Sequence, residues 1–207
     1  RGQLEGAKVI LLDLDSQALK NTKEFIEQSI NGAQVQTVAG DVADETLASR
    51  AVSEGLKHFG KLDILVNNAA MRNYDAIADA SVKDWQAMVG VNLIGTANFS
   101  KAALPALRMS GKGAIINVSS CYAVVGRKGM GLYDATKAGQ LALTRTLAFE
   151  EAQHGVRVNT VCPGSTLTDF HVGRAKKAGK DVEVLKTERQ TTSLIGRWAD
   201  PAEIAAP

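Results

Sequence analysis

Tyr133 stands four residues before Lys137 in the stretch YDATK, and Ser120 precedes the tyrosine by thirteen residues. Residues spaced by four share one face of a helix. A free tyrosine has a pKa of about 10, which is too high for a general base at neutral pH, but a nearby ammonium group favours the phenolate form. We therefore expect Tyr133 to exchange a proton with a substrate hydroxyl or carbonyl oxygen, while Ser120 hydrogen-bonds the same oxygen.

Two alternatives to this assignment remain open. Ser119 competes with Ser120 for the role at the substrate oxygen, although the spacing to Tyr133 favours Ser120. The tyrosine–lysine pair can also be an ordinary contact on the surface of a helix. Tyr122 provides an internal comparison, because the residue four positions after it is a glycine without charge.

The elements that must position these residues are short apolar runs that alternate with longer amphipathic stretches. Such runs predict buried strands, and the 3.6-residue period between them predicts helices. The expected strands are 8–15, 34–42, 62–70, 113–120 and 156–164; the expected helices are 16–31 with Ser16 as a candidate N-cap, one that begins after Asp44, 82–109 with an interruption near Asn92, and 133–151. Apolar strands separated by helices indicate a parallel sheet covered on both faces.

In parallel sheets of this kind, ligands bind beyond the carboxyl ends of the strands. Every expected strand here ends in polar or turn-forming residues. These are Asp13, Asp41, Asn67 with Asn68, Ser119 with Ser120, and Pro163 with Gly164. Each of them alone is also an ordinary turn or cap residue. Five such endings on one edge of a sheet predict a ligand site at that edge.

The composition restricts the class of protein. The 207 residues, 45% hydrophobic and 22% charged, are typical of one globular domain over the whole chain, 1–207. A net charge of +2 argues against a nucleic-acid partner, and no apolar run is long enough for a membrane span. The two cysteines make no disulfide framework, the three histidines lack metal-ligand spacing, and the first residues do not resemble a signal peptide. We expect a cytoplasmic protein without a metal site.

Several further motifs stand in a fixed order along nearly the whole chain. They are LDLD (12–15), GDV (40–42), NNAA (67–70), VN (91–92), INVSS (116–120), YDATK (133–137), VNTVCPGSTLT (158–168) and GRWADPAEIA (196–205). With this ordered set the sequence strongly resembles the short-chain dehydrogenase/reductase family. The resemblance implies a Rossmann-like doubly wound parallel sheet with helices on both faces. It also implies an oxidoreductase that interconverts a secondary alcohol and a ketone by hydride transfer with a nicotinamide cofactor.

The resemblance implies a catalytic role for four residues, namely Asn92, Ser120, Tyr133 and Lys137. In the family, the residue matched by Lys137 bonds the nicotinamide ribose hydroxyls. The residue matched by Asn92 positions a water molecule that feeds the proton relay.

Asp13 ends the first expected strand and points to the identity of the cofactor. A carboxylate there can accept hydrogen bonds from an adenosine ribose diol and would repel a 2′-phosphate. The next residue is Leu14, so no arginine follows that could receive such a phosphate. We therefore expect NAD rather than NADP. Asp15 is the rival for this role, but it is better placed to cap the following helix.

The resemblance adds further residues to the cofactor site. They are Asp41 and Val42 at the adenine ring, Asn68 and Ala69 in the NNAA motif, Tyr133 and Lys137 at the nicotinamide ribose, and Pro163, Gly164, Thr166 and Thr168 at the nicotinamide carboxamide. Ala70 stands where the family usually has glycine, and a positive φ at that position would cost an alanine about 1 kcal/mol.

Family features also set expectations for the rest of the chain. The family's first strand, its glycine-rich phosphate turn and its last strand are not recognisable, so we expect a fragment of a longer enzyme. The stretch at about 170–195 corresponds to the variable substrate lid, and Arg72 and Arg127 fall in other loops that face the active site in relatives. These basic residues suit either an acidic substrate or ordinary solvated loops. Relatives pack the helices at 92–109 and 133–151 across a subunit interface, so we expect a homotetramer or homodimer.

Two other functions remain as alternatives. One is a rival enzyme, either a glucose- or sugar-type dehydrogenase or an NADP-dependent reductase of the 3-oxoacyl type, and Asp13 argues against the latter. A different class is a dinucleotide-binding fragment without turnover. The unrecognised glycine-rich turn favours that class, and the intact set of Ser120, Tyr133 and Lys137 opposes it.

Overall fold

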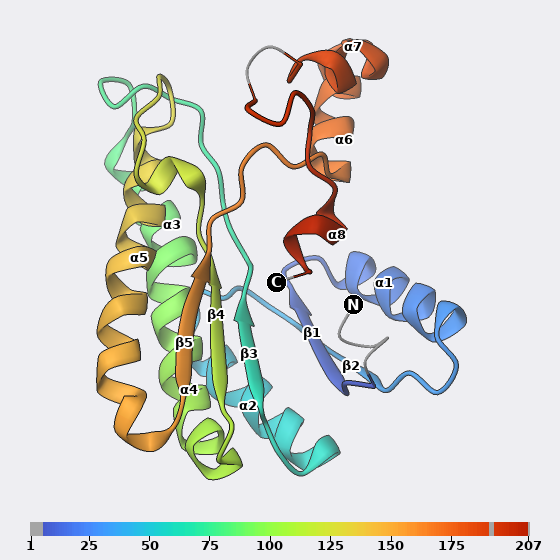
Figure 1. The fold of residues 1–207 in the computed structure, drawn as a ribbon, viewed down its shortest axis with the longest axis vertical. Helices are drawn as coiled ribbons and strands as arrows, with labels where there is room; N and C mark the ends of the chain where they lie inside the picture. The colour runs from blue at the N-terminus through green and yellow to red at the C-terminus, as the bar shows by residue number, and fades with distance from the viewer. Residues whose placement is uncertain (1–5, 191–192, 207) are drawn as a thin grey trace. The chain divides into compact units, whose positions relative to one another are not determined.

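The computed structural model describes residues 6–190 and 193–206, which divide into two units at residue 162 (Figure 1). Each unit is described by itself. Residues 191–192 of the expected lid lie outside the described residues.

The first unit begins with a pair of parallel strands, β1 (Val9–Asp13) and β2 (Val35–Ala39). Helix α2 (Glu45–Phe59) covers one face of the pair, where its Leu47, Ala48 and Ala51 pack with Val38, Ile10 and Leu12. Val35 points to the opposite face and is also buried, because side chains alternate along a strand. Helix α1 (Ser16–Ser29) contacts both strands. The prediction of helices on both faces is therefore confirmed for this pair.

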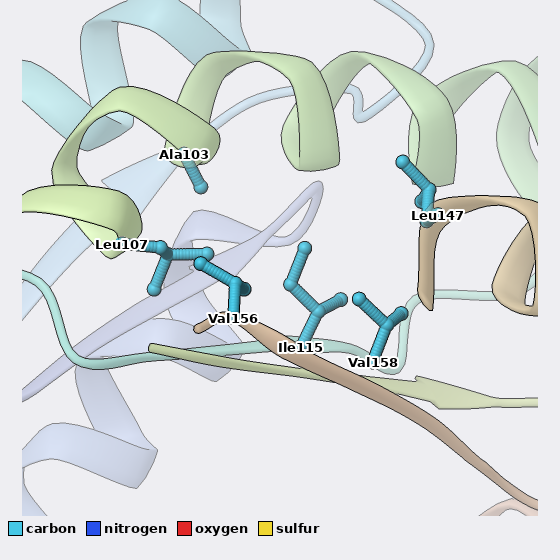
Figure 2. Packing of buried hydrophobic residues seen from close by; sticks show 6 residues of the cluster. All are labelled: Ala103, Leu107, Ile115, Leu147, Val156 and Val158. Atoms are coloured by element: carbon cyan, nitrogen blue, oxygen red, sulfur yellow. The ribbon is translucent and has the colours of Figure 1, made fainter. Parts of the chain in front are cut away.

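The same unit contains a parallel sheet of three strands in the order β3–β4–β5, with bounds Ile64–Asn67, Ala114–Val118 and Arg157–Val161. Helices α4 (Gly95–Ser110) and α5 (Gly131–Glu151) lie along one face of it (Figure 1). Figure 2 shows the core between these layers, which is formed by Ala103, Leu107, Ile115, Leu147, Val156 and Val158. On β3, Ile64 and Val66 are 55% and 53% exposed, so helices cover one face of this strand and leave its outward side chains open within the unit.

The helix starts follow local capping chemistry. Asp15 caps α1, and its carboxylate accepts from the backbone amides of Gln17 and Ala18, both at 2.9 Å. The prediction of Ser16 as the N-cap is wrong, because Ser16 is already the first helical residue. Asp44 caps α2 as predicted, by accepting from the backbone amide of Thr46 at 2.8 Å.

The expected helix at 82–109 is interrupted where the sequence predicted. Helix α3 (Val82–Val89) passes into a π-helical turn, Gly90–Ile94, which leads into α4. Asn92 lies in this turn and is fully buried. Single π-turns within helices are often found at functional sites, because the extra residue re-aims side chains and backbone carbonyls.

Helix α5 is tied to α4 by an ion pair between the buried Glu151 and the partly exposed Arg108. Glu151 is 2% exposed and accepts from Arg108 Nε at 2.8 Å and from Arg108 Nη2 at 2.6 Å. The hydrogen bonds from the guanidinium lower the pKa of the Glu151 carboxyl below its usual value of 4.5. Stability from this contact is therefore present above pH 4.5 and is lost as the pH falls through the lowered pKa.

We expect Glu151→Gln to lower the free energy of unfolding by about 1–2 kcal/mol at pH 7, because charge-assisted hydrogen bonds are replaced and Arg108 is partly screened by solvent. Urea titrations at pH 7 and pH 3.5 measure this. The difference between wild type and variant should shrink at the lower pH; a difference that stays constant would contradict the assignment.

The second unit contains three helices among the described residues. They are α6 (Asp169–Lys177), α7 (Val182–Thr187) and α8 (Pro201–Ile204). Trp198 is 8% exposed, packs with Ala175 and Leu185, and donates from Nε1 to the carbonyl of Leu185 at 2.8 Å. The stretch expected to form the lid is thus largely helical, with a small apolar core of its own.

Candidate active site

The turn that carries Tyr133 and Lys137 is fastened to the carboxyl end of β4 by two hydrogen bonds. Ser119 Oγ donates to the backbone carbonyl of Lys137 at 2.8 Å, and Lys137 Nζ donates to the carbonyl of Val118 at 2.6 Å. The serine pair that follows β4 and the lysine of α5 therefore meet at one point. The tertiary structure brings together residues that are eighteen and nineteen positions apart in the sequence.

Lys137 is 1% exposed, which is unusual for a lysine. Its pKa is lowered from 10.5 to about 8, chiefly by burial and secondarily by the positive charge of Arg72, while Cys162 acts in the opposite direction. Above pH 8 the amine therefore loses its proton in the ligand-free protein. A lysine that titrates this close to neutral pH is typical of functional sites.

Tyr133 is 4% exposed, and three cationic groups surround its ring. The ring centroid lies 5.7 Å from Lys137 Nζ, 5.3 Å from Arg72 Cζ and 5.6 Å from Arg127 Cζ. The charge of Arg127 is balanced by Asp134, which accepts from its guanidinium at 2.8 Å. Cations at this distance from an aromatic face are attracted to it, and the site is electropositive around the phenol.

The two serines are used differently. Ser119 donates its hydroxyl proton to the Lys137 carbonyl. Ser120, 6% exposed, accepts at Oγ from the backbone amide of Tyr122 at 3.2 Å. An accepting hydroxyl retains its own proton for another partner. This difference supports Ser120 over Ser119 as the group that addresses a substrate oxygen.

Asn92 joins the π-turn to the loop after β3. Its Oδ1 accepts from the backbone amide of Met71 at 2.7 Å, and its Nδ2 donates to the Met71 carbonyl at 3.0 Å and to Thr136 Oγ1 at 3.0 Å. Its own carbonyl accepts from Thr96 Oγ1 at 2.9 Å and from Gln140 Nε2 at 2.7 Å. Asn92 thus holds the loop, the π-turn and α5 together.

One residue of this site, Gln140, was not predicted from the sequence, whereas the resemblance implied that Arg72 lies in a loop facing the active site. Gln140 stands three residues after Lys137 and is fully buried against it. Arg72 approaches Tyr133 from the loop after β3. For Gln140 a signal existed, since a polar residue three positions from Lys137 shares its helix face. No spacing rule relates Arg72 to Tyr133.

The residues expected at the adenosine lie at the carboxyl ends of β1 and β2. Asp13 is exposed, and its Oδ1 accepts from the backbone amide of Asp15 at 3.0 Å. Asp41 Oδ1 accepts from the backbone amide of Ala43 at 2.9 Å. This contact forms an Asx turn, an ordinary structural role for an aspartate at a strand end. Val42 packs closely on α4, since a Cβ at Gly95 would lie 3.0 Å from the Val42 carbonyl oxygen.

The NNAA motif follows β3 as irregular backbone that contains Asn68 and Ala69. Asn67 anchors it, donating from Nδ2 to Asn117 Oδ1 of β4 at 2.8 Å. Among the described residues only glycines have positive φ, so Ala70 carries no such strain. The conditional cost expected for alanine at this position does not arise.

The residues expected at the nicotinamide carboxamide belong to the second unit. Pro163 and Gly164 begin it, and Thr166 Oγ1 contacts the Gly164 carbonyl at 3.4 Å. Thr168 precedes α6, and its Oγ1 lies 2.9 Å from Nδ1 of His171. Their part in cofactor binding stays a prediction.

The polar groups at the strand ends of the first unit suit a dinucleotide. The exposed carboxylate of Asp13 is an acceptor for a ribose diol, and the ammonium of Lys137 is a donor to hydroxyl oxygens. By contrast, the described part of the chain holds no cluster of three or more potential metal ligands. None of its described helices is long and apolar enough to cross a membrane.

Comparison with known proteins shows the family of this chain. A family model described as short chain dehydrogenase matches residues 3–179. An L-fucose dehydrogenase of Mus musculus is 36% identical over 202 residues, which cover 97% of this chain and 71% of the relative. Such a fold and site define an oxidoreductase that acts on CH–OH donors with NAD(P). The chain belongs to the short-chain dehydrogenase family.

Solved structures show the same fold. An NAD+-bound xylitol dehydrogenase superposes with a TM-score of 0.85 at 26% identity, covering 97% of this chain and 82% of that one. The L-sorbose reductase of Gluconobacter frateurii, complexed with NADPH and L-sorbose, superposes with a TM-score of 0.90 at 29% identity, covering 97% and 78%. The Rossmann-like α/β prediction is thereby confirmed, and the two structures differ in their nicotinamide cofactor.

Proposed function

We propose that this protein interconverts a secondary alcohol and a ketone with NAD(H), using Tyr133 as acid and base. The observation that carries the proposal is the fastening of the tyrosine–lysine turn to the serine-bearing end of β4. It joins the lysine of this pair to the serine pair at the carboxyl end of β4, and ligands of parallel sheets bind at that edge.

Each side chain has a distinct task in this mechanism. Ser120 donates its hydroxyl proton to the substrate oxygen and holds it beside the phenol. Tyr133 takes the proton of the alcohol during oxidation and returns one to the ketone oxygen during reduction. Lys137 stabilises the phenolate between these steps and hydrogen-bonds the ribose. The nicotinamide, when bound, accepts or supplies the hydride.

A substrate screen tests this function. The protein is incubated with NAD or NADP and a panel of sugar alcohols, aldoses and small secondary alcohols, and NADH or NADPH formation is followed by absorbance. Turnover with at least one substrate is expected. Cofactor binding without turnover across the panel would instead favour the dinucleotide-binding fragment.

We expect Asp13→Asn to lower the preference for NAD over NADP at least about ten-fold, because it removes a carboxylate that repels a 2′-phosphate. The measurement is kcat/KM for each cofactor with one substrate. Asp15→Asn is the matched control, since it makes the same change two residues away and asparagine still caps a helix. A change of preference in the control alone would assign the role to Asp15.

The edges of the sheets support a proposal about the complete fold. Within the described residues β1 pairs only with β2, and β3 pairs only with β4. Their other edges leave backbone donors and acceptors without a ladder partner. A further strand between β1 and β3, as the family resemblance implies, would satisfy both. A longer form of the protein that includes such a strand should unfold at a higher temperature than residues 1–207.

Exposed side chains on α4 and α5 support an oligomer. Met109 and Phe149 are 89% and 88% exposed, although both are large and apolar. We propose that these helices pack against a second copy, which would remove that surface from water. Light scattering coupled to size exclusion measures the mass; a monomer at micromolar concentration would contradict this.

A further inference from the structure

Gln140 lies between the expected catalytic lysine and the π-turn. Its side chain is fully buried. Oε1 accepts from Lys137 Nζ at 3.1 Å, while Nε2 donates to the carbonyl of Asn92 at 2.7 Å and to Thr96 Oγ1 at 2.9 Å. One carboxamide therefore connects the lysine to two groups at the π-turn.

The chemistry of its partners fixes the orientation of this amide. An ammonium only donates hydrogen bonds and a carbonyl oxygen only accepts them. Turning the amide over would place its NH2 group against Lys137 Nζ and its oxygen against the carbonyl of Asn92. Both contacts would be repulsive, so the amide of Gln140 has only one favourable orientation beside the lysine.

The carbonyl of Asn92 has its hydrogen-bonding capacity filled. A carbonyl oxygen has two lone pairs, and these accept from Gln140 Nε2 and Thr96 Oγ1. The family resemblance implies a water molecule near Asn92 that feeds the proton relay. In this chain, the side-chain amide of Gln140 occupies the position between the backbone carbonyl of Asn92 and the ammonium of Lys137. A carboxamide is not among the side chains that titrate, so it holds the lysine without carrying its proton.

We propose that Gln140 is a positioning residue that holds the Lys137 ammonium against the end of β4 and stabilises its charged form. This inference rests on the proposed function for its catalytic meaning, but the contact itself can be measured without turnover. The other titratable or charged groups that face Lys137 are Tyr133 on the same helix, Arg72 after β3 and Cys162 after β5. Gln140 carries no charge and supplies a side-chain hydrogen-bond acceptor to Lys137.

The test compares two variants of similar size and shape. Gln140→Met keeps the lysine buried and keeps its bond to the Val118 carbonyl, but removes its side-chain acceptor, so the pKa of Lys137 should fall by about one unit. Gln140→Glu places a carboxylate beside the ammonium, so this pKa should rise by about one unit or more. The readout is NMR titration of the protein labelled at lysine Cε, with the Lys137 signal identified through Lys137→Arg. An unchanged pKa in both variants would overturn the proposal.

Thr144→Val is the control for a purely structural effect. Thr144 lies one turn further along α5, is also buried, and hydrogen-bonds the backbone carbonyl of Gln140 and the side chain of Asn117. Removing its hydroxyl should lower stability and leave the pKa of Lys137 unchanged. If the pKa of Lys137 shifts as much in this control as in Gln140→Met, then packing, and not the carboxamide, determines that pKa.

Kinetics then connect the contact to catalysis. With a substrate from the screen, Gln140→Met should lower kcat about ten-fold near pH 8, and Gln140→Glu should move the alkaline limb of the pH profile upward. A uniform loss of activity at every pH in both variants would contradict the positioning role. If the wild type itself shows no turnover, the proposed function fails, while the NMR titration still decides the role of Gln140.

Discussion

Tyr133→Phe is expected to lower kcat/KM about a thousand-fold or more, because it deletes the one hydroxyl proposed to exchange a proton with the substrate. The ring keeps its place, since phenylalanine preserves the packing with Met88, Met130 and Leu132. Cofactor affinity should change little. The measurements are steady-state kinetics at several pH values and quenching of tryptophan fluorescence by NADH.

Tyr122→Phe is the matched control for this variant. Tyr122 is the neighbouring tyrosine, and its ring lies 3.7 Å from the guanidinium carbon of Arg127. Removal of its hydroxyl leaves that stacking intact, so activity should stay within about two-fold of wild type, which is a small free-energy difference. Retained activity in Tyr133→Phe, or an equal loss in both variants, would exclude Tyr133 as the acid and base.

The buried lysine is expected to make the stability of the protein depend on pH. The pKa of Lys137 falls from 10.5 in the unfolded chain to about 8 in the folded one, so between these pH values the unfolded chain binds the extra proton. The free energy of unfolding should therefore rise with pH over this window, by about 3 kcal/mol from this residue. At pH 7 both states are protonated, and the full cost of burying the charge is present.

Lys137→Met isolates this contribution. Methionine fills similar space without a charge, so the variant should lack this part of the pH dependence. Urea titrations at pH 7 and pH 10 give the difference in unfolding free energy between wild type and variant. That difference should move in favour of the wild type by about 2–3 kcal/mol as the pH rises. A difference independent of pH would show that Lys137 is not buried as a cation in the ligand-free protein.

Such a cost has a functional interpretation. A protein selected for stability alone would place an apolar residue at position 137, within a helix that already packs its Leu147 into the core. A charge held in a dry site acts on a neighbouring phenolate more strongly than one in water. Burying the charge of Lys137 is thus expected to lower stability, and the same burial strengthens its effect on the proton transfer expected at Tyr133.

Much of the fold could be predicted from the sequence because its causes are local. Strand and helix periods identified the α/β class, Asp44 marked the start of α2, and the break before α4 was visible at Asn92. Both Ser16 and Asp15 were predicted as caps of α1 from the sequence, and Asp15 is the residue that caps it. Adjacent cap-forming residues can each start a helix, and the backbone at the end of β1 decides between them.

The catalytic turn was likewise visible in the sequence, since a spacing of four places Tyr133 and Lys137 on one helix face whatever surrounds them. The electrostatic environment of these two residues could not be predicted from the sequence. The burial of Lys137, the approach of Arg72 to the phenol and the link from Gln140 to Asn92 depend on packing between segments up to 61 residues apart. Desolvation and hydrogen bonds of that kind exist only once the loop after β3, the π-turn and α5 are packed together. The sequence determined which groups can react, and the tertiary structure decided how strongly they are charged and held.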